Sequence, residues 1–385
     1  MRKSLMGWES CSWGLCRPSV GSKPNKIHLE QPNQNRLFNP NLHPTLGSMA
    51  RAPVLTFTDR GIYCPAGDFY IDPWRPVDRA LITHGHADHA RPGMGSYLAT
   101  HQALPVMRHR LGTIDARGIS YDEVRTIGRA QVSFHPAGHV PGSAQIRVEV
   151  AGEVWVASGD YKVVDDGLSD PFEPVKCHHF ITESTFGLPV FRWPDQVAVA
   201  ADLNAWWRGC VDAGKTAFLG AYSLGKAQRL MSMLDPSIGP ILTHTAVENT
   251  NVVLRGQGIK LAETVHVTPE LNPKEYPGAL VLSPPSAQGS AWARRFGPQE
   301  TAFASGWMAL RGIRRRRAGD RGFVISDHAD WAGLLWAIKQ TEAESIYVTH
   351  GYTDIFTRYL NDHGWHAQVI PTQFEGALAE AEDGG

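Results

Sequence analysis

The sequence lacks the features of a membrane or secreted protein. No stretch approaches the roughly 20 consecutive apolar residues that span a bilayer, and no apolar segment follows the basic start Met1-Arg2-Lys3. Cysteine is scarce, with five residues scattered over 385 positions, and an odd, dispersed set argues against a disulfide framework. We therefore expect no membrane association and a location in the reducing cytoplasm.

An excess of charge of one sign is also missing. The formal net charge is −1, so a nucleic-acid partner would need a local basic patch and not a polycationic molecule. The apolar and charged fractions, 42% and 19%, are those of an ordinary globular protein, and this length favours two domains. What the sequence does have is 17 histidines, several of them beside acidic residues.

The composition changes along the chain. Residues 1–48 are rich in Asn, Pro and Ser without a periodic apolar pattern, which predicts disorder, and Met49 is a plausible alternative start. Short apolar strands are predicted at residues 80–83, 131–134, 144–150, 153–157, 179–182, 323–325 and 345–348, most of them followed by histidines or acids. Between them, helices at 196–213 and 225–234 alternate with strands at 216–220, 279–282 and 302–304. This block suggests a second α/β unit inserted into the first.

The first metal-binding pattern directly follows the strand at residues 80–83. His84-x-His86-x-Asp88-His89 places four side chains that can bind metal within six residues. Imidazole and carboxylate suit Zn²⁺ or Mn²⁺, and alternate residues of a tight loop can face different ions. The plainer alternative is a histidine-rich surface turn or an adventitious site. The spacing after an apolar strand favours a binuclear centre.

This pattern resembles the signature of the metallo-β-lactamase superfamily, and later motifs narrow the resemblance. Residues 136–144 (PAGHVPGSA) and 158–160 (SGD) are similar to its third and fourth motifs. Residues 182–187 (TESTFG), 326–330 (SDHAD) and 348–351 (VTHG) are similar to three motifs of its β-CASP branch. That branch contains nucleic-acid phosphodiesterases. Residues 63–74 (YCPAGDFYIDPW) and 305–308 (SGWM) bring the chain nearest to bacterial ligase-associated DNA exonucleases, from which residues 1–48 depart.

The resemblance implies a set of metal ligands around two divalent ions, Zn or Mn. His84, His86 and His139 would hold one ion. Asp88, His89 and His350 would hold the other, and Asp160 would bridge the two. Asp72 would orient a ligating histidine and fix its tautomer. Two ions held in this way stabilise both the attacking and the leaving oxygen of a phosphodiester displacement.

The resemblance also implies a catalytic pair. His328 would be the general acid for the leaving sugar oxygen, and Glu183 would pair with it and hold it protonated. A strand-end cap or a simple salt bridge is the alternative for Glu183.

Candidate nucleic-acid contacts are basic residues near these motifs. Lys226 begins a predicted helix, where it could meet phosphate or simply start the helix. The arginine run is either a solvated turn or a contact to backbone phosphates. Its members are Arg311, Arg314, Arg315, Arg316 and Arg317.

Together these features predict an α/β protein: a four-layer αββα metallo-β-lactamase sandwich with an inserted β-CASP cap. The expected boundaries are 49–190 and 322–385 for the sandwich and 191–321 for the cap. The expected function is metal-dependent hydrolysis of DNA by an exonuclease in repair, with a DNA ligase and a helicase as partners implied by the resemblance. An RNA-processing nuclease is the first alternative. A thioester or lactam hydrolase and an inactive nucleic-acid-binding scaffold are more distant ones.

Overall fold

The computed structural model describes residues 53–317 and 319–372. The extension predicted at residues 1–48, with Met49, lies outside this part of the chain. Within it, the main strands form three sheets, and no helix is both long and apolar enough to cross a membrane.

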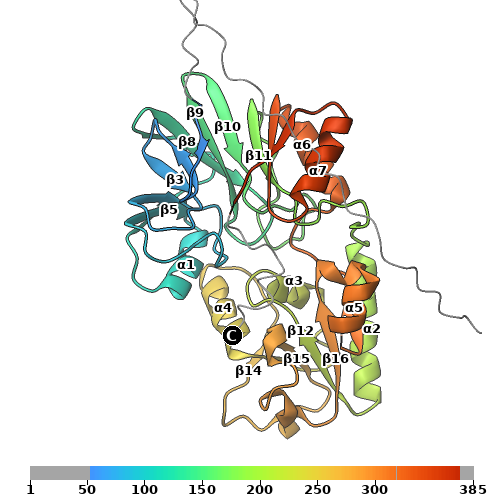
Figure 1. Cartoon of the computed structure of the whole chain (residues 1–385). Coiled ribbons are helices and arrows are strands. Elements are labelled where there is room, and N and C mark those ends of the chain that lie inside the picture. The colour runs from blue at the N-terminus through green and yellow to red at the C-terminus, as the bar shows by residue number, and fades with distance from the viewer. Residues whose placement is uncertain (1–52, 318, 373–385) are drawn as a thin grey trace, which may run out of the picture. The chain divides into compact units, whose positions relative to one another are not determined.

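The first sheet is built from the N-terminal part of the described chain (Figure 1). In spatial order its strands are β1 (Thr56–Phe57), β2 (Ile62–Cys64), β3 (Phe69–Ile71), β4 (Arg79–Leu81), β5 (Ser96–Thr100) and β6 (Ala116–Ile119). The pairs β1–β2 and β2–β3 are antiparallel, and β3 to β6 run parallel. Helix α1 (Ala103–Leu111) buries Leu104 and Met107 in one apolar cluster with Ala80 and Tyr97 of this sheet.

The second sheet joins segments far apart in the sequence. Its spatial order is β19 (Ala367–Val369), β18 (Ser345–Thr349), β11 (His179–Glu183), β10 (Glu153–Ala157), β9 (Ala144–Val150), β8 (Ala130–Pro136) and β7 (Arg125–Ile127). Alternation along β10 shows how it is buried on both faces. Trp155 packs into the core shared with the first sheet, whereas Val154 and Val156 pack on the opposite side.

Two helices cover that opposite side. Leu334 and Ile338 of α6 (Trp331–Thr341), with Phe356 and Leu360 of α7 (Thr353–Asp362), lie in the same apolar cluster as Val156. Figure 1 shows both helices, in red, beside the strands of this sheet. Helix, sheet, sheet and helix therefore stack in four layers, and the predicted αββα sandwich is confirmed.

The insert, called the cap below, comprises α2 (Gln196–Asp212) to β17 (Arg321–Phe323) and is built on a third sheet. The order is β14 (Val265–His266), β13 (Ile241–Thr243), β15 (Leu280–Ser283), β12 (Thr216–Gly220), β16 (Gln299–Ala304) and β17. All its pairs are parallel. Its helices are α2, α3 (Lys226–Met233), α4 (Thr245–Gly256) and α5 (Arg311–Arg317).

Local chemistry explains the cap's central strand and first helix. Leu219 of β12 packs in one cluster with Trp207 of α2, and Phe218 packs on the other face of the sheet. The Asp195 side chain caps α2 by accepting a hydrogen bond from Ala198 N at 2.9 Å. The inserted α/β unit is thus confirmed, while the domain boundaries at 190/191 and 321/322 stay predictions; β17 crosses the second of them.

Candidate metal centre

The site forms where strands of the sandwich end. Strands β10, β11 and β18 are parallel neighbours, so their carboxyl ends meet at one edge of the sheet. Asp160 follows β10, Glu183 ends β11 and His350 follows β18. The loops after β4 and β8 add the His84–His89 segment and His139. Every residue that the sequence predicts as a metal ligand therefore lies in a segment that follows a strand.

Two positions show that the backbone is constrained here. Gly159 has a φ of 57°, and a Cβ at this residue would lie 2.6 Å from the Thr83 side chain, so only glycine lets the Asp160 loop pass so close. His350 has a φ of 56°. A left-handed conformation at a residue with a Cβ costs on the order of 1–3 kcal/mol and is typical of functional sites.

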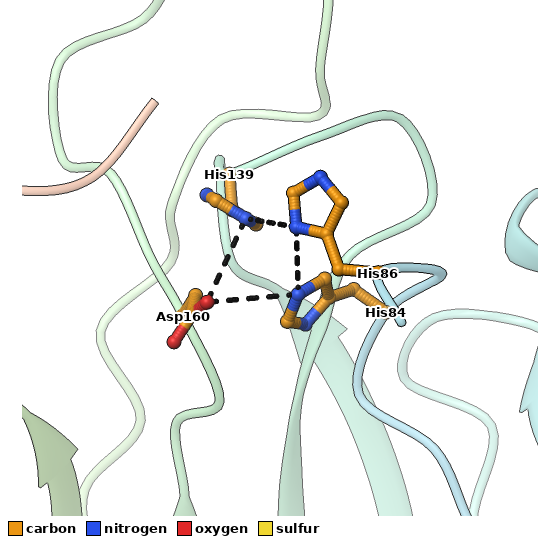
Figure 2. A group of neighbouring side chains, drawn as sticks. All are labelled: His84, His86, His139 and Asp160. Carbon is orange, nitrogen blue, oxygen red and sulfur yellow. Dashed lines mark hydrogen bonds and ion pairs between the residues drawn. The ribbon is translucent and has the colours of Figure 1, made fainter. Parts of the chain in front are cut away.

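The first ligand group consists of His84, His86, His139 and Asp160, whose donor atoms converge in Figure 2. His86 Nδ1 lies 3.1 Å from His84 Nε2 and 3.0 Å from His139 Nε2. The Oδ2 atom of Asp160 lies 3.6 Å from His84 Nε2 and 3.8 Å from His139 Nε2. Two nitrogens bound tetrahedrally to Zn²⁺ at about 2.0–2.1 Å are roughly 3.4 Å apart. The spacing therefore fits donors around one ion.

The second group shares an atom with the first. Oδ2 of Asp160 also lies 3.5 Å from His89 Nε2, and the donors of His89, Asp160 and His350 lie within 4.8 Å of one another. Oδ2 of Asp88 is 3.6 Å from His89 Nε2. The His350 ring stacks on the His89 ring with centroids 5.2 Å apart. Asp160 is thus placed to contact two ions at once.

Two buried carboxylate oxygens test whether cations fit this site. Among the described residues, Asp88 Oδ1 and Asp160 Oδ1 have no hydrogen-bond partner. Leaving a buried polar atom unsatisfied costs about 1–3 kcal/mol, and more for a charged group. A divalent cation removes that penalty, and the nitrogen and carboxylate donors are those that Zn²⁺ and Mn²⁺ bind. The residues present fit a metal site.

Each histidine of the centre is oriented through its other ring nitrogen. His89 Nδ1 lies 2.7 Å from Asp72 Oδ2, and Asp72 also accepts from Thr83 N at 2.8 Å. His139 Nδ1 lies 2.9 Å from the carbonyl oxygen of Asp327. Such contacts fix the tautomer and the ring plane of a ligating histidine. The position of Asp72 is the one that the sequence predicts for an orienting residue.

Burial and charge set the protonation of the centre. Burial, helped by neighbouring histidines, holds the pKa of His84 and His139 well below the usual value. Both rings are therefore neutral at pH 7, the form that binds metal. Burial also tends to lower the pKa of His89, but Asp88 and Asp160 outweigh it and raise that pKa well above the usual value. Burial opposes ionisation of Asp160, yet the facing histidines, His89 above all, hold its pKa well below the usual value.

Glu183 and His328 form a buried pair beside the first ligand group. His328 Nδ1 lies 2.9 Å from Glu183 Oε2 and 3.1 Å from Oε1. Glu183 Oε1 also accepts from Tyr161 N at 2.8 Å, so the carboxylate is held from two sides. The His328 ring centroid is 4.6 Å from that of His139. Glu183, His328 and Asp160 also place donors close enough to share an ion, but both Glu183 oxygens are engaged as described.

Sequence reasoning missed a buried charge network behind this pair. Asp327, the residue before His328, accepts from Lys226 Nζ at 2.9 Å and lies 3.7 Å from Arg229 Nη1. Arg229 also donates to the carbonyl of Ser326. All of these side chains are buried. The network extends to a further ion pair, in which Lys162 Nζ lies 3.5 Å from Asp166 Oδ2. The cap helix α3 thereby holds the loop that carries His328. The one local sequence signal for this network was Asp327, the first acidic residue of the SDHAD motif.

The predicted nucleic-acid contacts are placed in two different environments. Lys226 is 4% exposed and its ammonium faces Asp327, so it points at a protein carboxylate and not at an open surface. The five arginines predicted as phosphate contacts are exposed on α5, and none of them is among the described ligand groups of the centre.

Comparisons with known proteins bear on this arrangement. No family model matches the chain. A relative named "Probable DNA ligase" from Opitutus terrae is 29% identical over 319 residues, which are 80% of this chain and 30% of that protein. "Endoribonuclease ysh1" of Aspergillus fumigatus is 31% identical over 120 residues, 30% of this chain and 14% of the relative. "RNase aCSPSF2" of Saccharolobus solfataricus is 31% identical over 119 residues, 30% and 24% of the two chains.

A solved structure agrees on the fold. A protein of unknown function from Enterococcus faecalis V583 superposes with a TM-score of 0.51 at 13% identity, covering 77% of this chain and 80% of its own. The chain is metallo-β-lactamase- and β-CASP-like. It spans less than a third of the length of the three sequence relatives described above.

Proposed function

We propose that the protein is a metal-dependent nuclease that hydrolyses DNA phosphodiester bonds, acting as an exonuclease on DNA ends in repair alongside a DNA ligase. The observation that carries this proposal is the pairing of His328 with Glu183 next to two ligand groups that share Asp160. Metal ligands alone suit many hydrolases. A buried, oriented histidine beside them adds a proton donor for a leaving oxygen.

The donor positions support the ligand assignment. His84, His86 and His139 would hold one ion, and Asp88, His89 and His350 the second, with Asp160 between them. Asp72 would hold His89 in its binding tautomer. Two divalent ions bound there would supply Lewis acidity, activating water and stabilising charge on the phosphodiester oxygens. Mass spectrometry of the metal bound to the purified protein distinguishes Zn²⁺ from Mn²⁺.

His328 and Glu183 would perform the proton transfer. The Glu183 carboxylate faces Nδ1 from 2.9 Å, which keeps a proton on that nitrogen and stabilises the imidazolium. Nε2, on the other side of the ring, would then donate its proton to the departing sugar oxygen. Tyr161 N holds Glu183 during this step, so the carboxylate need not reorganise as the histidine changes charge.

DNA is the favoured substrate because the relative named "Probable DNA ligase" matches 80% of this chain. The same relative supports the proposed association with a ligase, and the helicase and the cytoplasmic location stay predictions. RNA is the second candidate, since two of the relatives described above are named as ribonucleases, although they match 30% of the chain.

The test uses purified full-length protein with end-labelled DNA and RNA of matched sequence, in Zn²⁺ or Mn²⁺. We expect stepwise shortening of the DNA. His86→Ala should lose bound metal and activity, whereas Glu183→Gln should keep metal and lose activity. His363→Ala, an exposed position on the sandwich, is the matched control, and metal is counted by mass spectrometry. Preferential cutting of RNA would overturn the choice of DNA, and full activity of His86→Ala would overturn the metal site.

A further inference from the structure

A pocket of about 390 Å³ opens beside His86, between the sandwich and the cap. One side is formed by the His86–Ala87 segment and the last turn of α1, with His109 and Arg110. The other is formed by the loop at Tyr222, by Asn249 of α4 and by a proline pair. We propose that this pocket binds the nucleoside adjacent to the phosphodiester under attack. The proposal rests on the proposed function and deepens it.

Position is the first argument. His86 belongs to both places: its Nδ1 lies 3.0 Å from His139 Nε2 within the ligand group, and its side chain also lines the pocket. Its Nε2 lies 3.4 Å from the carbonyl oxygen of Leu224, another lining residue. A phosphodiester held at the metal centre would therefore have the pocket immediately next to it. The group attached to that phosphate is a nucleoside.

Charge is the second argument. No acidic residue is among the described residues that line the pocket, whereas Arg110 and His109 are. The Arg110 guanidinium is already oriented, because Nη1 donates to the carbonyl of Gly85 at 2.7 Å and to that of Ala90 at 3.4 Å. Its planar fork also carries N–H groups on Nη2 and Nε. Asp88 acts on this guanidinium electrostatically but does not line the pocket. An oriented cation in a lining without carboxylates favours the anionic phosphates that flank a nucleoside in a nucleic acid.

The third argument is the match to a base. Tyr222 presents an aromatic ring, and the Lys226 ammonium over that ring, 4.9 Å from its centroid, helps to fix the ring in place. Bases stack on such rings without strong sequence preference. Asn249 is exposed on α4 and offers both a donor and an acceptor to a base edge. Pro284 and Pro285 supply apolar wall, and the volume lies in the range of small-molecule sites.

Binding of small probes tests the pocket without requiring cleavage. Isothermal titration of the full-length, metal-loaded protein compares deoxyadenosine 5′-monophosphate, deoxyadenosine and inorganic phosphate. We expect the nucleotide to bind more tightly than phosphate. Tyr222→Leu and Asn249→Ala should each weaken nucleotide binding about five- to tenfold or more, in keeping with the loss of one stacking or base-edge contact, and should leave phosphate binding unchanged. Tyr222→Phe should bind the nucleotide as tightly as the unmodified protein does, because it keeps the aromatic ring.

The matched control is Val252→Ala, an exposed position on α4 outside the pocket, which should bind all three probes as the unmodified protein does. If nucleotide and phosphate bind equally, or if the pocket variants bind like Val252→Ala, the pocket proposal is overturned. Nucleotide binding that responds to the variants, in a protein that cuts neither DNA nor RNA, would overturn the proposed nuclease activity and leave the pocket standing. In an active enzyme, the pocket variants should raise KM and leave kcat and metal content unchanged.

Discussion

Replacing Lys226 by methionine removes one half of a buried ion pair and keeps most of the side-chain volume. Lys226 is 4% exposed and Asp327 2% exposed, and Nζ lies 2.9 Å from Oδ2. Removing one partner of a buried pair typically costs about 3–5 kcal/mol, because the other charge is left in a poorly solvated place. Arg229 Nη1, 3.7 Å from Oδ1 of Asp327, compensates part of that charge. We therefore expect Lys226→Met to lower the free energy of unfolding by about 3 kcal/mol, the lower end of the range.

An exposed lysine–glutamate ion pair in the same chain is the matched control. The side chains of Lys176 and Glu342 form an ion pair while 63% and 71% exposed, so Lys176→Met should cost less than about 1 kcal/mol. Urea unfolding followed by tryptophan fluorescence compares the two variants, using the signal of the chain's 12 tryptophans. The double variant Lys226→Met/Asp327→Asn should lose less than the sum of its two single variants. Equal costs for Lys226→Met and Lys176→Met would refute the reasoning from burial.

Three further predictions concern the metal centre and the Cys177 thiol. Asp72→Ala should weaken metal binding by about 10–100-fold, because His89 loses the group that orients it; competition with a chromophoric chelator measures this, and unchanged affinity would contradict it. In the metal-free protein, burial lowers the pKa of His84 and His139, so the unfolded chain takes up protons below about pH 6.5 that these buried rings do not. The free energy of unfolding should therefore decrease as the pH is lowered from 7.5 to 5.5. His89, whose pKa is raised, contributes in the opposite direction and makes this decrease smaller. An increase in the free energy of unfolding over this range would contradict the neutral state of the two rings. Burial raises the pKa of the Cys177 thiol to about 12, so iodoacetamide at pH 8 should label it only in denaturant, as peptide mapping by mass spectrometry would show.

Regular strands and helices could be predicted from the sequence because their signals are local. The alternation in residues 144–150 and the apolar run at 153–157 match β9 and β10 at both ends. The strand predicted at residues 323–325 does not match the structure in the same way, because β17 covers Arg321–Phe323. Ile325 is 3% exposed in the cap core without belonging to a strand. An apolar run shows that a segment is buried, but it does not distinguish a buried loop from a strand.

The candidate ligands could be named from the sequence because their motifs are short and end predicted strands. The structure brings all seven together, including His350, which lies 261 residues beyond His89 in the sequence yet stacks its ring on it. No local pattern marks the partners of Asp327, since Lys226 is 101 residues away from it. Whether a lysine at a helix start meets phosphate or a buried carboxylate depends on the packing of the cap, which its own neighbours in sequence do not reveal.

That packing gives the cap a role in the centre itself. Arg229 donates to the carbonyl of Ser326, and Lys226 neutralises the Asp327 side chain. The carbonyl of Asp327 orients His139, and the next residue is the proposed acid His328. One short loop thus connects the cap helix α3 to a metal ligand and to the proton donor. Because these contacts are buried and partly ionic, a small shift of α3 would leave charges unpaired. The cap therefore acts as part of the framework that holds His139 and His328 in position, in addition to forming one wall of the pocket beside His86.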